Sequence, residues 1–581
     1  GLVLQALRRP AEALAACDRA LALRPNFVEA ANNRGNALRD LNRLAEAVAA
    51  YDHALRLRPD FALAHSNRAN ALAGLGRLAE ALEGYDRALQ LWPDFPDALN
   101  NRGRVLRDLK RFPEAAACFE RLLAVQPATP FGPGMLLDTR LQACDWSGLA
   151  EQRTRIEAGI ARGERADAPF SFLCHSTSAE LQRRCAELFV ADQHPPAPAL
   201  STGARYDHDR IRLCYLSGDF HQHATAYLMA ELFETHDRAR FEIVGVSFGP
   251  ADGSAMRARL EKGFDRFIDM RATSDLEVAR WLRDNEIDIA VDLKGFTAAN
   301  RAGIFSHRGA PLQVAYLGFP GTMGAPFIDY LIADHHVVPP GHERFYSEKI
   351  VRLPDCYQVN DRRRSIDAKT PSRAALGLPE SAFVFCSFNN NYKIRPDVFD
   401  VWMRLLGDTP QSVLWLLDDN EAAKANLRRE AGQRGIAADR LLFAPRLPLE
   451  QHLARHRAAD LFIDTFPVNA HTTASDALWA GLPVVTLQGE TFVSRVAASL
   501  VQTIGLPELA TDTLANYEST IRRLAGSPGQ LKAVRERLVA ARTTTPLFDT
   551  DRLRRHIEAA FIEMHRRQQE GLPADSFDVR A

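Results

Sequence analysis

A polar segment, NAHTTASD (residues 469–476), interrupts a stretch of sequence that is otherwise apolar. The run DLFIDTF before it is typical of a buried strand, and the residues after it are typical of a helix. If that helix begins near Thr472, its first N–H groups and the positive end of its dipole form an anion site, and the hydroxyls of Thr472 and Thr473 add donors. A threonine N-cap completed by an acidic residue is the alternative, but it accounts for neither His471 nor the second threonine.

Two further polar segments follow strand-like runs. SFNNNYKIRP (387–396) offers several amides and Lys393, whose charge could pair with a diphosphate, although a lysine alone is more often a solvated surface group. SGDFHQHATAY (217–227) holds His221 and His223. An imidazole with a pKa of about 6.5 can accept a proton from a hydroxyl group. The three segments together indicate a site for a phosphate-bearing ligand and for proton transfer.

Several common catalytic chemistries lack their sequence motifs. Neither GxGxxG nor GxxxxGK[ST] follows a strand-like run, and no GxSxG elbow indicates a hydrolase triad. The adjacent His335 and His336 would point to opposite faces of a strand, so they cannot easily share one metal ion. The Asp-x-Asp matches at 207–209 and 549–551 lie away from the strand ends where a metal–diphosphate site belongs. We therefore expect no metal and no cofactor.

The polar segments belong to a region in which strand-like and helix-like stretches alternate. This alternation predicts parallel sheets covered by helices on both faces, and two series of strands predict two doubly wound, Rossmann-like lobes. Ligands bind such folds at the carboxyl ends of the strands. The first series reads IRLCYLS, FEIVGVS, IDIAVDL, LQVAYLG and DYLIAD, and the second reads AFVFCSF, SVLWLLD, RLLFAP, DLFIDTF and PVVTL.

The first 127 residues repeat with a period of 34. Proline recurs at this spacing in LALRPNF, LRLRPDF, LQLWPDF and LAVQPAT, and it ends a helix that it cannot continue. Alanines with the same period suit close helix packing. The pattern resembles the tetratricopeptide repeat and predicts an α-solenoid. Because the sequence opens inside the leading helix of a repeat, we expect earlier repeats in the native protein.

Asparagines recur in the first helix of three repeats, at Asn33, Asn67 and Asn101. One interpretation is helix capping or hydrogen bonding between repeats. The other, which we favour, is a row of carboxamides that holds a peptide backbone in the concave groove, since a carboxamide both donates and accepts.

The bulk composition excludes several classes of protein. The formal net charge of −1 provides no overall field for nucleic acid, and the apolar runs are far shorter than the roughly 20 residues that span a bilayer. The eight cysteines include no CxxC pair and fit a reducing compartment better than a disulfide framework. Positions 1–30 show no signal peptide. We expect a cytoplasmic protein with no nucleic-acid partner and no membrane span.

Taken together, these features resemble the O-linked N-acetylglucosamine (O-GlcNAc) transferase family, in a bacterial form, over essentially the whole chain. The resemblance implies a GT-B arrangement of the two lobes and inverting, metal-independent transfer of GlcNAc from UDP-GlcNAc to serine or threonine of proteins. The segments that carry it are the repeats together with SGDFHQHATAYL, YLGFPGTMGAPFIDY, YSEKIVRLP, FNNNYKI, SVLWLL, NAHTTASDALWAG and GETFVSRVAASL.

The resemblance also implies roles for individual residues in binding the UDP-sugar. Lys393 would bind the diphosphate and stabilise the leaving UDP, and His471, Thr472 and Thr473 would hold the same phosphates. Asp476 would hold the ribose. Gly321 and Thr322 in YLGFPGTMG join the predicted donor site, although a simple tight turn explains these glycines equally well.

Other positions match the family less closely. His452 would lie against the uracil, and Asn390 stands where eukaryotic relatives carry glutamine. Leu449 replaces a lysine near the nucleotide, which puts one contact with the ribose or uracil in doubt. His223 matches a histidine proposed as catalytic base, and the alternative is that it only orients the sugar or the acceptor. His221, beside it, replaces a glycine.

We predict four regions: repeats at 1–127, a helical linker at 128–205, an N-terminal catalytic lobe at 206–372 and a UDP-binding C-terminal lobe with a final helix at 373–581. The predicted function is a protein O-GlcNAc transferase whose repeats bind protein or peptide acceptors. One alternative keeps the fold and uses UDP-glucose or another UDP-hexose, with asparagine as a possible acceptor. A second is a non-catalytic repeat scaffold that senses nucleotide.

Overall fold

The computed structural model describes residues 3–4, 7, 9–201 and 203–580. The chain divides into two compact units, Gly1–Asp145 and Trp146–Ala581. The expectation of earlier repeats concerns sequence before Gly1 and lies outside the described residues.

The first unit is the predicted solenoid of antiparallel helix pairs. Small residues allow the helices to approach closely: Ala47, Ala81 and Ala115 are fully buried. At Gly35 an added Cβ would lie 2.5 Å from the ring of Tyr51, so only glycine fits against that ring. The helices are α2 (Pro10–Leu23), α3 (Val28–Asp40), α4 (Leu44–Leu57), α5 (Ala62–Gly74), α6 (Leu78–Leu91), α7 (Pro96–Asp108), α8 (Phe112–Val125) and α9 (Gly132–Gln142).

The periodic asparagines form hydrogen bonds between neighbouring repeats. The Nδ2 of Asn67 donates to Oδ1 of Asn32 at 3.1 Å, and Nδ2 of Asn101 donates to Oδ1 of Asn70 at 2.9 Å. Asn67 is buried, whereas Asn33 and Asn101 are partly exposed. Hydrogen bonding between repeats, the interpretation that we favoured less, is therefore observed for Asn67 and Asn101. Contact of the asparagine row with a peptide stays a prediction.

The predicted boundary between repeats and linker needs correction. Helix α9 packs on α8, and the solenoid unit extends to Asp145 rather than to residue 127. The rest of the predicted linker, with α10 (Leu149–Ala161), α11 (Pro169–Leu173) and α12 (Ala179–Gln193), belongs to the second unit. Loss of the 34-residue period marks the end of the repeat sequence but does not prevent one more helix from packing on the solenoid.

The N-terminal lobe contains an eight-stranded parallel sheet in the order β14-β7-β6-β5-β4-β1-β2-β3. All five strands predicted for this lobe are present, and the sequence reading missed β3, β7 and β14, two of which are short edge strands. The bounds are β1 (Ile211–Ser217), β2 (Phe241–Ser247), β3 (Arg266–Asp269), β4 (Ile289–Asp292), β5 (Leu312–Ala315), β6 (Tyr330–Asp334), β7 (Lys349–Leu353) and β14 (Phe577–Asp578).

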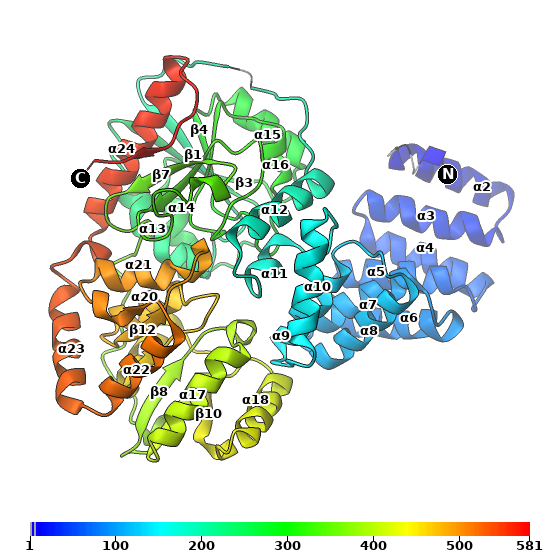
Figure 1. Cartoon of the computed structure of the whole chain (residues 1–581). Helices are drawn as coiled ribbons and strands as arrows, with labels where there is room; N and C mark the ends of the chain where they lie inside the picture. Colours follow the sequence, from blue (N-terminus) through cyan, green and yellow to red (C-terminus); the bar gives the residue numbers. More distant parts are fainter. Residues whose placement is uncertain (1–2, 5–6, 8, 202, 581) are drawn as a thin grey trace. The chain divides into compact units, whose positions relative to one another are not determined.

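The C-terminal lobe, whose strands β8, β10 and β12 are labelled in Figure 1, contains a six-stranded parallel sheet in the order β10-β9-β8-β11-β12-β13. Its five predicted strands are present, and only the two-residue edge strand β13 was missed. The order changes direction beside β8 and β11, which is where a doubly wound sheet binds ligands. The bounds are β8 (Phe383–Ser387), β9 (Ser412–Leu417), β10 (Leu441–Ala444), β11 (Leu461–Ile463), β12 (Val484–Leu487) and β13 (Ala510–Thr511).

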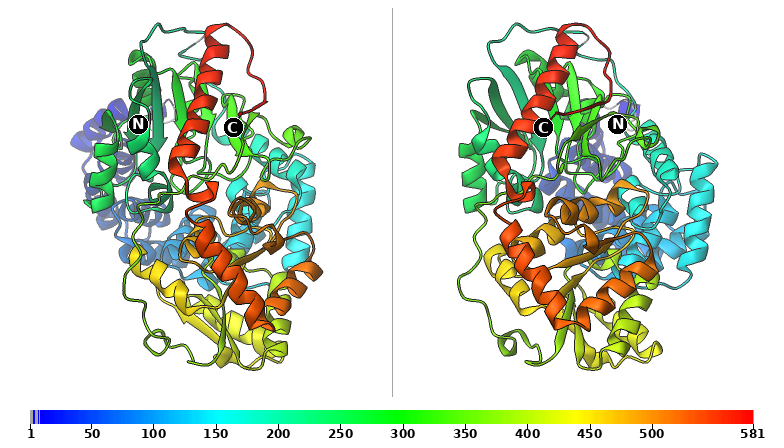
Figure 2. Two further views of the ribbon diagram at one scale, coloured as in Figure 1. Left: turned by 90° about the vertical axis from the view of Figure 1, so that its left-hand side faces the viewer. Right: turned by 60° about the vertical axis from the view of Figure 1, so that its left-hand side comes forward.

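The end of the chain returns to the N-terminal lobe, so the predicted range 373–581 is wrong as one lobe. Helix α24 (Thr550–Gln569) packs on α13 (Ala224–Thr235), and Figure 2 shows it, in red, against the green strands. Oε1 of Glu558 in α24 lies 2.9 Å from Nδ1 of the buried His236. Strand β14 then pairs with β7, Phe577 opposite Val351. An amphipathic helical pattern predicts the helix but does not say which lobe covers its apolar face.

No helix within the described ranges is both long enough and apolar enough to cross a membrane.

Candidate active site

The NAHTTASD segment lies where the sequence placed it, between a central strand and a helix. Helix α20 (Thr472–Trp479; Figure 1) begins at Thr472 with His471 as its N-cap residue. It follows the central strand β11. The first N–H groups of a helix have no partner within the helix and carry the positive end of its dipole. The start of α20 therefore offers a site for an anion at the carboxyl edge of the sheet.

Asp464, which directly follows β11, organises the loop before α20. Its Oδ1 accepts hydrogen bonds from the backbone N–H groups of Thr465 and Ala470, both at 2.7 Å, and its Oδ2 accepts from the hydroxyl of Thr486 at 2.7 Å. Burial nevertheless raises the pKa of Asp464 to about 6. Sequence reasoning missed this residue, although an aspartate at the end of an apolar run was a usable signal.

Asn389 connects Asp464 to the start of α20. Its Nδ2 donates to Oδ1 of Asp464 at 3.1 Å, and its Oδ1 accepts from the hydroxyl of Thr473 at 2.7 Å. Because the Thr473 proton is used in this bond, the oxygen of Thr473 can only accept from a further partner. The donors at this site are therefore the backbone N–H groups of α20 and the hydroxyl of Thr472 rather than that of Thr473.

Lys393 lies at the same edge of the sheet, in the 3-10 turn Asn391–Lys393 after β8. Its Nζ donates to the carbonyl oxygen of Asn469 at 2.8 Å. Burial lowers the pKa of Lys393 to about 8, and the nearby Asp464 carboxylate opposes part of that shift. A half-buried ammonium is thus held beside the loop that leads into α20, where a diphosphate would be stabilised by both.

His471 is electrically neutral in this environment. Burial, with a smaller contribution from Lys393, lowers the pKa of His471 to about 3. Its Nε2 lies 3.3 Å from the carbonyl oxygen of Val493, an arrangement in which Nε2 carries the proton and donates it. The Nδ1 is then an acceptor, so this side chain orients the loop and supplies neither charge nor a second donor to a phosphate.

Asp476 is the fifth residue of α20 rather than part of its first turn, and it forms a buried ion pair. Nη1 of Arg364 donates to Oδ1 of Asp476 at 2.6 Å, and both side chains are almost fully buried. Burial raises the pKa of Asp476 to about 6 even though Arg364 opposes the shift. A ribose hydroxyl would therefore have to share this carboxylate with Arg364, a partner that sequence reasoning missed.

His452 and Asn390 lie on neighbouring elements of the same lobe. His452 belongs to α19 (Leu449–Arg455), packs edge-on against His456 at a centroid distance of 4.7 Å, and has its pKa held well below the usual value by burial. A neutral ring of this kind can lie against a base. Asn390 is exposed, and its Oδ1 accepts from Arg446 at 3.3 Å.

In the N-terminal lobe, His223 is the N-cap of α13, and its Nδ1 accepts from the N–H of Thr225 at 3.3 Å. Burial lowers its pKa, while Asp219, whose Oδ2 is 3.5 Å from that nitrogen, opposes the shift. With Nδ1 as acceptor, the ring proton lies on Nε2; to accept a proton at Nε2, the imidazole would first have to carry its proton on Nδ1, giving up the Thr225 bond and donating to Asp219 instead. The buried Lys294, at the end of β4, donates to Oδ1 of Asp219 at 2.6 Å. The sequence reading had overlooked both Asp219 and Lys294.

The hydroxyl of Thr322 forms its hydrogen bonds within the protein. Its hydroxyl donates to Oε2 of the buried Glu348 at 2.7 Å and accepts from the N–H groups of Gly324 and Ser347, each at 3.1 Å. The N–H of Gly321 donates to the carbonyl oxygen of Phe319 at 3.0 Å. These bonds fit the tight-turn interpretation, and a contact of Gly321 or Thr322 with a UDP-sugar stays a prediction.

The structure thus collects Lys393, His471, Thr472 and Thr473 at one edge of the C-terminal sheet, with Asp476 one turn further along α20. His223 lies in the other lobe, at the start of α13. Among the described residues, no group of three or more His, Cys, Asp or Glu side chains is placed to hold a metal ion.

A helical repeat solenoid followed by two parallel-sheet α/β lobes defines a GT-B type of protein. The model of glycosyl transferase family 41 matches residues 173–370 and 367–557, and tetratricopeptide repeat models match 35–76 and 66–133. The chain therefore belongs to glycosyl transferase family 41, which confirms the resemblance and the fold class inferred from the sequence.

Individual relatives agree with this assignment. A probable UDP-N-acetylglucosamine–peptide N-acetylglucosaminyltransferase, SEC, of Arabidopsis thaliana is 36% identical over 376 residues, which are 64% of this chain and 38% of the relative. The corresponding transferase of Caenorhabditis elegans is 27% identical over 478 residues, 63% of this chain and 42% of that protein. The chain thus spans about two fifths of the length of these two relatives.

A solved structure covers almost the whole chain. A mutant of the O-GlcNAc transferase of Thermobaculum terrenum superposes with a TM-score of 0.73 at 25% identity, over 94% of this chain and 98% of that one. The order of repeats followed by two α/β lobes is therefore shared over almost the whole length of both chains.

Proposed function

We propose that this protein transfers GlcNAc from UDP-GlcNAc to serine or threonine hydroxyls of proteins. The observation that carries the proposal is the Lys393 ammonium held 2.8 Å from the carbonyl oxygen of Asn469, beside the start of α20. The Lys393 ammonium and the positive N-terminal end of α20 together suit the diphosphate of a nucleotide-sugar. Membership of glycosyl transferase family 41 and the names of the relatives support GlcNAc as the sugar.

The reaction we propose is a single in-line displacement with inversion. The acceptor hydroxyl oxygen forms a bond to the anomeric carbon while the bond from that carbon to the diphosphate oxygen breaks. The electron pair of the broken bond stays on UDP, where Lys393 and the N–H groups of α20 stabilise it. The hydroxyl proton passes to the neutral His223. No metal ion takes part in this scheme, because Lys393 and α20 supply the positive charge.

The repeats would bind the protein acceptors, with Asn33, Asn67 and Asn101 along their groove, and the protein would act in the cytoplasm. Tetratricopeptide repeats commonly present an extended concave surface to a partner, which supports this role.

The test is transfer of labelled sugar from UDP-GlcNAc to the proteins of a cell lysate, with the Lys393→Ala variant in parallel. We expect labelling of serine and threonine by wild type and near-complete loss in the variant. Unlabelled UDP-glucose at equal concentration should not compete, and labelling should survive EDTA. Competition by UDP-glucose would favour the alternative hexose donor. Restoration by Mn²⁺ after EDTA would contradict the metal-independent scheme, and no labelling by wild type would favour the nucleotide-sensing scaffold.

A further inference from the structure

A cavity of about 700 Å³ lies where the chain crosses between the two lobes. The chain leaves the N-terminal sheet after β7 and enters the C-terminal sheet at β8, and Arg362 lines the cavity from that first crossing. It returns between α23 (Pro528–Ala541) and α24, and residues 542–546 line the cavity from that second crossing. Trp479, the last residue of α20, also lines it. An occupant would contact both crossings and the far end of the helix that begins at the donor site.

Four arginines line this cavity, and two of them have no carboxylate partner. Arg362 pairs with Glu231 at 2.7 Å and with Asp551 at 2.6 Å, and Arg552 pairs with Asp355 at 2.6 Å. Within the described part of the chain, neither Arg542 nor Arg555 lies within ion-pair distance of a carboxylate. Of the two aspartates in the lining, Asp551 is neutralised by Arg362, and Asp549 caps the start of α24 through the N–H of Arg552 at 2.9 Å.

Arg542 is held in place without an anion. Its guanidinium lies 4.7 Å from the centroid of the Trp479 ring. Its Nε is buried and has no hydrogen-bond partner in the described structure. Burial, with Arg457 nearby, lowers the pKa of Arg542, so its positive charge is poorly compensated. Such a group gains more from an added anion than an arginine that is already paired.

The start of α24 faces the same cavity through Asp549, Asp551, Arg552 and Arg555. A helix of 20 residues places the positive end of its dipole there, which favours an anion in the space beside it. The Asp549 carboxylate already compensates part of this positive end, so the two arginines without a carboxylate partner supply most of the attraction for an anion.

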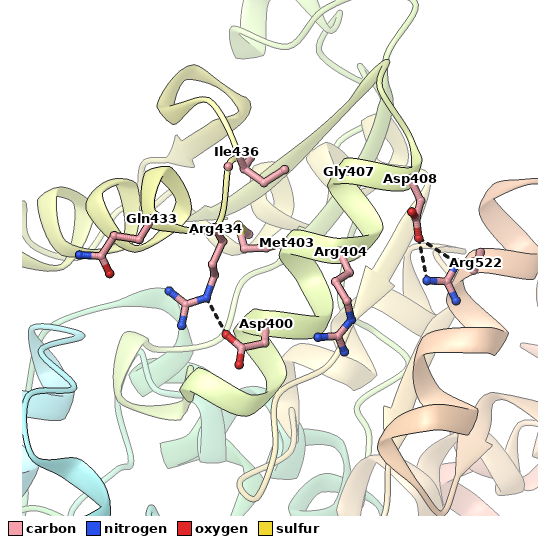
Figure 3. Close-up of a pocket in the computed structure, with 10 residues that line it drawn as sticks. Asp400, Met403, Arg404, Gly407, Asp408, Gln433, Arg434, Ile436 and Arg522 are labelled. Atoms are coloured by element: carbon pink, nitrogen blue, oxygen red, sulfur yellow. Dashed lines mark hydrogen bonds and ion pairs between the residues drawn. The ribbon is translucent and has the colours of Figure 1, made fainter.

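A second arginine-lined cavity, of about 780 Å³, provides a contrast (Figure 3). There, Arg434 pairs with Asp400 and Arg522 pairs with Asp408, each at 2.6 Å, as the dashed lines of Figure 3 mark. Arg404, in the same lining, pairs with Glu518 at 2.6 Å. Every arginine of that cavity already has a carboxylate, so it has no comparable affinity for an added anion.

We propose that the cavity between Arg542, Arg555 and the start of α24 is a binding site for a phosphate-type oxyanion, separate from the donor site. The oxyanion is either free phosphate or the phosphate group of a small metabolite, since both present the same tetrahedral acceptor to the guanidinium groups. Because both crossings come together only in the folded chain, an occupant that contacts them stabilises the folded state, by an amount that rises with the logarithm of ligand concentration once the site is mostly filled. The inference does not depend on the sugar that the protein transfers.

The test is a titration of the Lys393→Gln variant, which removes the charge at the donor site, with inorganic pyrophosphate, orthophosphate and glucose 6-phosphate. Binding is measured by calorimetry and by the fluorescence of Trp479, with Trp479→Phe identifying that signal. We expect saturable binding of at least one probe and a rise in melting temperature. The probe that binds most tightly distinguishes free phosphate from a sugar phosphate.

Arginine variants of the two cavities show in which cavity the probe binds. Adding Arg542→Gln and Arg555→Gln should weaken binding by roughly tenfold or more, since two charge-assisted bonds are lost. Adding Arg404→Gln and Arg434→Gln in the other cavity should leave it unchanged. If the first pair fails to fold, Arg555→Gln alone, at an exposed side chain, gives the same comparison. No binding by any probe, or equal binding in both sets of variants, would overturn the proposal.

Discussion

The ammonium nitrogen of Lys393 lies 2.8 Å from the carbonyl oxygen of Asn469, which joins the loop after β8 to the loop before α20. These loops follow the two adjacent central strands of the C-terminal sheet. The contact brings a side-chain cation and a helix start to one place without a glycine-rich loop.

Replacing Lys393 by alanine should lower kcat by roughly 10²–10³-fold, the range seen when one preorganised group that stabilises developing charge is removed. The measurement is the rate of sugar transfer to a peptide acceptor. Lys532→Ala is the matched control, because Lys532 is an exposed lysine of α23 whose ammonium lies 3.8 Å from Glu536 of the same helix. Similar rates for both variants would remove the role assigned to Lys393.

The affinity for UDP should fall as the pH rises above about 8, the pKa of Lys393 in the free protein. Only the charged ammonium attracts the diphosphate, so each pH unit above that value should weaken binding by up to about tenfold. Calorimetry between about pH 7 and pH 9 measures this, below the ionisation range of most other cationic side chains. The Lys393→Ala variant should show a flat profile, and an equally steep profile in that variant would assign the effect to another group.

Arg364→Met should destabilise the fold by about 3–5 kcal/mol, because it leaves the buried Asp476 carboxylate without its partner. The loss should be larger at pH 8 than at pH 5. Without Arg364 the folded-state pKa of Asp476 rises further above its unfolded value, so the stability of the variant falls as the pH rises through that pKa. Urea unfolding at both pH values measures this. The double variant Arg364→Met/Asp476→Leu should recover much of the loss, and no recovery would contradict the pairing.

Asp476→Asn should weaken binding of UDP more than binding of 2′-deoxy-UDP if the carboxylate accepts from the ribose. Loss of one hydrogen bond to a charged group corresponds to about 1.5–3 kcal/mol. Calorimetry with the two nucleotides gives the comparison, and an equal loss for both would restrict Asp476 to its structural pair with Arg364.

His223→Ala should lower kcat by about 10²–10⁴-fold, the usual contribution of a positioned base. Since the neutral imidazole is the active form, the rate should fall as the pH drops through the lowered pKa of His223. Asp219→Asn removes the carboxylate that opposes this lowering, so it should move the acidic limb of the pH–rate profile to lower pH. A loss in kcat of less than about fivefold in His223→Ala would favour the orienting role over base catalysis.

The local parts of the fold could be predicted from sequence because they depend on residues close together in the chain. The 34-residue period, the ten strand-like runs and the start of α20 at Thr472 all follow from spacing within short windows. The residues that resemble the family motifs, Lys393 and Thr472 among them, were found in the same way. Short edge strands such as β13 and β14 were missed because two residues carry no periodic pattern.

What only the tertiary structure decided is which partner each polar group has. Arg364 and Asp476 are 112 residues apart in the sequence, and Glu558 and His236 are 322 residues apart. No local sequence pattern therefore predicts either contact. The first contact means that Asp476 is already paired, and the second places α24 on the N-terminal lobe. Likewise, His471 was recognised as a site residue, but its pKa of about 3, set by burial, makes it neutral. The sequence determined which side chains gather at the strand ends, whereas burial and long-range pairing determined their charges and free hydrogen-bonding groups, because both depend on neighbours that only folding brings together.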